Sequence, residues 1–84
     1  MAISQGDLGG TKNGSNLAFT VPVTPIAGSL RIVFNTGTLK IVNQATWDAS
    51  TATQKIVRAL VVGANVTLGL APASTDDLWY ECDV

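Results

Sequence analysis

The amino-acid sequence predicts a small all-β fold, an antiparallel β-sandwich or barrel of about six short strands with one polar insert. Short segments in which apolar side chains alternate with others, such as residues 17–21 and 30–35, have the period of two that is typical of half-buried strands. Proline and glycine turn signals separate these segments at short intervals. The chain has 84 residues, enough for one domain with a thin hydrophobic core.

The N-terminal segment differs from the rest. Residues 1–10 contain three glycines and show no sustained periodicity, which predicts a flexible N-terminal arm. We therefore expect an arm over residues 1–10 and a single β-domain over residues 11–84. Because such an arm becomes ordered against a neighbouring molecule, its apolar residues Ile3 and Leu8 are interface candidates.

The first strand is expected over residues 17–21, directly after the turn signal "NGSN". Asn and Gly tolerate positive φ, and an Asn side chain can accept hydrogen bonds from nearby backbone, so this signal favours a tight reversal. Pro22 and Pro25 have no backbone N–H, so they end the strand and carry the chain to the next one.

Further strands are expected over residues 30–35, 39–42, 66–70 and 77–84, with Pro72 marking a strand end. Between them, residues 43–53 are polar, small and aperiodic. They predict an inserted loop with a helical turn after Thr46 or Asp48 as N-cap. The inward residues of the strands form the predicted core: Leu17, Phe19, Val21, Leu30, Ile32, Phe34, Val66, Leu68 and Leu70.

Residues 54–63, "QKIVRALVVG", fit two interpretations. A helix would place Ile56, Ala59 and Leu60 on one face, whereas a strand would alternate two rows of side chains. The four β-branched residues within residues 55–62 and the closing Gly63 favour the strand.

The composition argues against an enzyme. The chain has no histidine, so the usual proton shuttle and any His-containing triad or metal site are missing. Asp76 and Asp77 are adjacent, and neighbouring side chains of extended chain point apart, so they do not form an acid/base pair. Asp7 lies among glycines, but one carboxylate does not fill a cation's oxygen shell. We expect no catalytic residues, no metal and no cofactor.

The charge pattern and the short apolar stretches also argue against nucleic acid and membrane as partners. The five cationic residues are scattered, so they form no basic stripe for a phosphate backbone. The longest apolar stretch, residues 59–64, is far below the roughly 18 residues of a membrane span. The start of the chain lacks the pattern of a signal peptide, which predicts a protein made and assembled in a cytoplasm. The single cysteine, Cys82, is expected to be a small buried hydrophobic residue.

The overall composition of the chain instead indicates a protein partner. Apolar residues make up 46% of the chain and charged residues only 13%, about half of the roughly 25% found in ordinary soluble domains. Trp47 in the polar insert and the pair Trp79 and Tyr80 are the aromatic interface candidates. Adjacent strand residues face opposite sides, so one of Trp79 and Tyr80 should enter the core. The alternatives are that these aromatics only pack within the fold or that one of them stacks on a sugar.

Two stretches resemble a known family. "TKNGSNLAFTVPVTPIAGSLRIVFN", residues 11–35, and "VVGANVTLGLAPASTDDLWYECDV", residues 61–84, are similar in motif and order to a small β-domain found in virion structural proteins of tailed bacteriophages. The chain departs from this family over residues 38–60, which are longer and less patterned than the family's hairpin.

The resemblance implies a non-enzymatic structural protein of a phage particle, located in the virion. Its partners would be copies of itself, as a homo-oligomer, and other virion proteins such as the major capsid or tail proteins. Within this class we expect a capsid decoration or cement protein. The alternatives are a neck, tail or fibre component, or a receptor- or carbohydrate-binding module.

Overall fold

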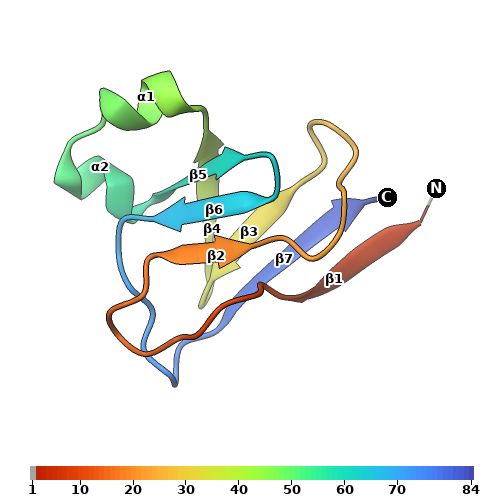
Figure 1. Ribbon diagram of the computed structural model, residues 1–84, viewed down its shortest axis with the longest axis horizontal. Helices are drawn as coiled ribbons and strands as arrows, with labels where there is room; N and C mark the ends of the chain where they lie inside the picture. The colour runs from red at the N-terminus through yellow and green to blue at the C-terminus, as the bar shows by residue number, and fades with distance from the viewer. Residues whose placement is uncertain (1) are drawn as a thin grey trace.

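Seven strands and two short helices make up the computed structural model, which describes residues 2–84 (Figure 1). The elements are β1 (Ile3–Asp7), β2 (Ala18–Thr20), β3 (Arg31–Phe34), β4 (Gly37–Val42), α1 (Gln44–Asp48), α2 (Ala52–Ile56), β5 (Arg58–Val62), β6 (Asn65–Leu68) and β7 (Leu78–Asp83). The fold is therefore mostly β, as predicted, although it has one strand more than expected.

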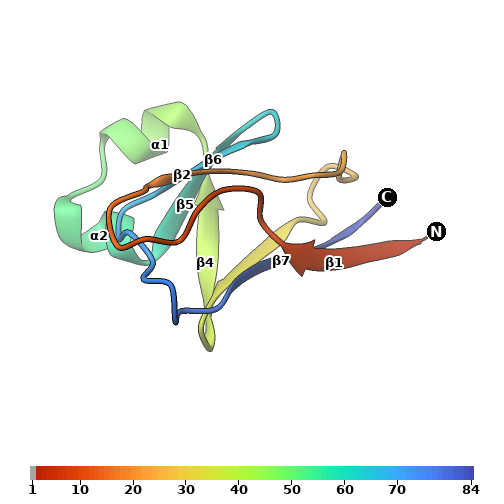
Figure 2. The ribbon, with the colours of Figure 1, turned by 60° about the horizontal axis from the view of Figure 1, so that its bottom comes forward.

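The strands form one curled, mixed sheet in the order β1-β7-β3-β4-β5-β6-β2 (Figures 1 and 2). All neighbouring strands are antiparallel except β4 and β5, which are parallel. A parallel pair needs a crossover connection, and α1 and α2 provide it. The sheet thus resembles a half-barrel with a mixed strand arrangement, where the sequence predicted a wholly antiparallel one.

The ends of the sheet meet at a single point. Gly9, just after β1, and Thr20, in β2, form an isolated antiparallel bridge. Each donates its N–H to the other's carbonyl oxygen at 2.8 Å. The curled sheet is therefore closed at this bridge and open elsewhere along the seam between β1 and β2.

The N-terminal segment is a strand where an arm was expected. All of Ile3–Asp7 pairs with β7, from Ile3 opposite Asp83 to Asp7 opposite Trp79. The sequence signal was weak because Ile3 is the only large apolar residue within Ile3–Asp7. β1 is held mainly by backbone hydrogen bonds to β7, which any residue except proline can supply.

The polar insert folds into the two helices. Asn43 caps α1, its side chain accepting from the N–H of Thr46, so the predicted caps at Thr46 and Asp48 are wrong. Thr51 caps α2 in a capping box with Gln54. Residues 54–63 then divide between the two interpretations, because α2 continues to Ile56 and β5 begins at Arg58.

The turn before β2 has the chemistry that the sequence predicted. The side-chain oxygen of Asn13 accepts hydrogen bonds from the N–H groups of Ser15 and Asn16, both at 2.9 Å. Gly14, between them, has a φ of 82°, which glycine adopts without strain. β2 ends at Thr20, before the two prolines.

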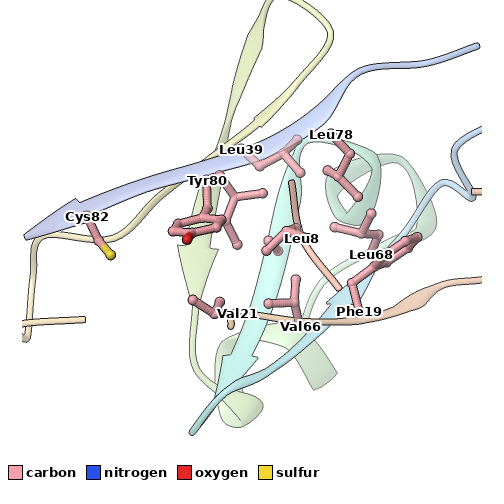
Figure 3. Close-up of a cluster of buried hydrophobic side chains, with 11 residues drawn as sticks. Leu8, Phe19, Val21, Leu39, Val66, Leu68, Leu78, Tyr80 and Cys82 are labelled. Carbon is pink, nitrogen blue, oxygen red and sulfur yellow. The ribbon is translucent and has the colours of Figure 1, made fainter. Parts of the chain in front are cut away.

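The hydrophobic core fills the inside of the curl (Figure 3). Of the predicted core residues, Leu30 and Phe34 are partly buried against it, whereas Leu17 and Leu70 are 41% and 49% exposed. Leu17 precedes β2 and Leu70 follows β6, so strand alternation no longer directs their side chains inward. The remaining predicted core residues are all buried in this cluster: Phe19, Val21, Ile32, Val66 and Leu68.

Candidate interface

The outer face of the sheet has a covered half and an uncovered half. Val42 of β4 and Leu60 of β5 are partners in the sheet, and Trp47 of α1 packs on them to form a second apolar cluster. The ammonium group of Lys55 lies 5.2 Å from the centroid of the Trp47 ring. Trp47 is only 8% exposed, so this interface candidate is a packing residue that holds α1 on the sheet.

The pair Trp79 and Tyr80 divides as strand alternation requires. Tyr80 is buried, and its hydroxyl lies 3.0 Å from the Ser4 hydroxyl of β1. Trp79 faces outward and is half-buried. On the half of the outer face that the helices leave uncovered, it stands between its Cα partners, Asp7 of β1 and the buried Val33 of β3. The sequence could not decide which of the two aromatic residues turned inward, because both positions suit either.

A shallow hollow of about 430 Å³ lies beside Trp79. Its lining combines the indole ring with polar groups of Gln5, Asp7 and Asp77 and the backbone of Gly6. The only ion pair found within residues 2–84 joins Arg31 to Glu81 at 3.4 Å, so neither carboxylate of the hollow is neutralised by a neighbouring cation there. An aromatic ring flanked by hydrogen-bond acceptors suits a ligand or partner with donor groups.

β1 begins and β7 ends at the end of the molecule opposite the helices (Figures 1 and 2), and three exposed aliphatic residues belong to the segments that meet there. We call Ile3, Ile26 and Val84, which are 70%, 49% and 43% exposed, the apolar end. Backbone hydrogen bonds fix these segments together, from Ile26 N–H to Asp83 and from Val84 N–H to Ala2. The sequence had indicated only Ile3 among these three.

Leu8, the other candidate from the expected arm, lies elsewhere. It is buried in the main core, in the same cluster as Phe19 and Tyr80 (Figure 3). Leu8 follows β1 at an even-numbered position, on the same inward side as Ser4, which contacts Tyr80. Leu8 therefore stabilises the fold and is not available to a partner.

No metal-binding group appears in the part of the chain that the structure describes, where three or more His, Cys, Asp or Glu residues nowhere come together. Among residues 2–84 no helix has the length and hydrophobicity needed to cross a membrane. Cys82 is buried in the core. Burial raises the pKa of its thiol, and the negative charge of Asp83 raises it further.

Comparison of the chain with protein-family models, curated proteins and solved structures finds no match. The surface of the molecule and the motifs of its sequence are therefore the features from which a function is inferred. Two surface features are candidate binding sites, namely the hollow beside Trp79 and the apolar end.

Proposed function

We propose that the chain is a non-enzymatic structural protein of a tailed-phage particle, specifically a capsid decoration or cement protein that binds neighbouring subunits. The observation that carries this proposal is the apolar end, where Ile3, Ile26 and Val84 are each exposed on backbone segments that are hydrogen-bonded to one another. Exposed apolar groups are costly to leave in water, and when they gather at one site they mark a contact with another protein.

The low charge of the chain supports the same conclusion. Permanent interfaces are more apolar than transient ones, and only 13% of the residues are charged. Trp79 adds an outward aromatic ring, the side chain that most often anchors an interface. On a shell, many copies share the load, so modest contacts per copy are sufficient.

The resemblance of residues 11–35 and 61–84 to phage virion β-domains supports the class of particle. The same surface would also serve a neck, tail or fibre component, which is the alternative within this class.

The proposal is tested by adding purified protein to phage shells that lack it and measuring saturable binding. Ile26→Lys should weaken binding at least tenfold, because it places a charge in the apolar end. Val57→Lys is the matched control, since Val57 is also exposed but lies beside α2. Absence of saturable binding to shells, with binding to isolated tails or necks instead, would move the protein to those structures, and binding to neither would refute the proposal.

A second candidate function is a carbohydrate-binding module, and the hollow beside Trp79 is the observation that favours it. The flat indole can stack on the C–H face of a sugar while Asp7, Asp77 and Gln5 accept or donate hydrogen bonds to its hydroxyls. A glycan array separates the two functions. Binding to a defined glycan that is lost in Trp79→Ala would support the module, whereas a decoration protein should give no signal.

A further inference from the structure

The backbone of β1 has one side that no strand covers. Val84 N–H donates to the carbonyl of Ala2, so even-numbered residues of this segment direct their backbone groups toward β7. Gly9, at an odd-numbered position, directs its groups to the opposite side, where it bonds to Thr20. By this alternation Ile3, Gln5 and Asp7 also direct their N–H and C=O groups to that opposite side.

Proline explains why β2 does not continue along this edge. Extending the Gly9–Thr20 register would place Pro22 opposite Asp7, and Pro22 has no N–H to donate. The chain departs there instead, and the N–H of Val21 bonds to Ala64. Within residues 2–84, no strand pairs with the outer edge of β1.

The edge also lacks most of the features that prevent strand addition. Natural proteins protect exposed edges with proline, lysine, bulges or very short strands. β1 is five residues long, contains neither proline nor lysine, has one charged residue, Asp7 at its end, and pairs with β7 without a bulge. The opposite edge strand, β2, has three residues and is already bridged by Gly9.

We propose that a second copy of this chain adds its own β1 to this edge, antiparallel, about a two-fold axis through Gln5. In this register Gln5 faces the partner's Gln5, and Ile3 faces the partner's Asp7. Each facing pair exchanges both backbone hydrogen bonds, so every outward group of Ile3, Gln5 and Asp7 is satisfied. The edge is thus complementary to itself, which is the requirement of a two-fold interface.

Two other symmetric registers, in which the axis is moved by two residues, are poorer. An axis through Asp7 would set two carboxylates against each other and would require the groups of Gly9 that Thr20 already uses. An axis through Ile3 would leave Asp7 without a partner strand. The Gln5 register also places the partner's Ile3 in the same row of the outer face as Asp7 and Trp79, beside the hollow. The most exposed large apolar residue, Ile3, is then partly covered.

This inference deepens the proposed function by naming one contact, and it rests on that function only for the role of the contact in a particle. Self-association is measured without any shell, so each proposal can fail while the other stands. Because the edge is short, we expect association near the weak end of the measurable range, at protein concentrations up to about 1 mM.

Disulfide trapping tests the register. In Gln5→Cys the two Cα atoms would lie about 5.5 Å apart, within the range that a disulfide spans. In Ile3→Cys they would lie about 14 Å apart, because four residues at roughly 3.4 Å separate each position from its own copy. Under mild oxidation Gln5→Cys should give a linked dimer and Ile3→Cys should not, although Ile3 is 70% exposed. The double variant Ile3→Cys/Asp7→Cys should link, and the native Cys82 is buried and does not compete.

Sedimentation of backbone variants provides the second test. Gln5→Pro removes an N–H that points to the open edge and leaves the hydrogen bonds to β7 intact, so it should sediment as a folded monomer. Gln5→Ala keeps that N–H and should associate like the wild type. The proposal is overturned if the wild type is monomeric at about 1 mM. A monomer would instead be the result for an edge that pairs only with a different protein. The proposal is equally overturned if Ile3→Cys links as fast as Gln5→Cys, or if Gln5→Pro associates like Gln5→Ala.

Discussion

Gly9 and Thr20 hold the two edges of the curled sheet together, each N–H donating to the other's carbonyl oxygen at 2.8 Å. Leu8, which precedes the bridge, is buried in the same core cluster as Phe19, which precedes Thr20. The bridge also fixes where the seam closes and where β1 remains open. The stability of the fold and the proposed strand addition thus depend on the same short segment.

Substitution of Gly10, which follows the bridge, should destabilise the protein. Gly10 has a φ of +134°, and an added Cβ would lie 2.6 Å from Cδ1 of the buried Phe19. We expect Gly10→Ala to lower the free energy of unfolding by about 2 kcal/mol or more. Gly37→Ala is the control, because the nearest atom to its Cβ is 3.8 Å away, and its denaturation midpoint should change little. Equal midpoints for the two variants in urea would contradict this role of Gly10.

The two tryptophans should respond differently to truncation. Trp47→Ala removes a side chain that is packed on Val42 and Leu60, so we expect a loss of about 3–5 kcal/mol in the free energy of unfolding. Trp79→Ala removes a half-buried outward ring and should cost about 1 kcal/mol. Thermal denaturation measures both. A larger loss for Trp79 than for Trp47 would reverse the assignment of packing and interface residues.

Cys82 should make stability fall at alkaline pH. Burial, with a further effect of Asp83, raises the pKa of its thiol in the folded state. The folded protein therefore keeps the proton when the unfolded chain, with a thiol pKa of about 8.5, has lost it. The stabilisation is complete below that pH and is lost as the pH rises through the folded value. The difference in unfolding free energy between wild type and Cys82→Ala should shrink from pH 7 to pH 10, and a constant difference would contradict this effect.

The sequence predicted the elements that carry strong local signals. The alternation of residues 30–35 is one such signal, and β3 forms there. The side chain of Asn13 is another, and it accepts the hydrogen bonds of the turn before β2. The two prolines that end β2 acted through a missing N–H, which is a property of the residue itself.

The remaining features depend on partners distant in the sequence. β1 forms because it pairs with β7, and no pattern within residues 3–7 predicts this pairing. Trp47 is buried because Val42 and Leu60 meet beneath it in a parallel pair. The hollow joins Asp7 to Asp77, which lie at opposite ends of the chain. Local periodicity contains no information about contacts between residues that are far apart in the sequence.

The most direct test of the proposed structural role is a cryo-electron microscopy reconstruction of the phage particle to which we propose that this chain belongs. We predict density for the curled sheet in repeated copies on the outer surface of the shell, with the apolar end or the β1 edge against a neighbouring subunit. A complete map in which every shell, neck, tail and fibre density is accounted for by other proteins would contradict the account.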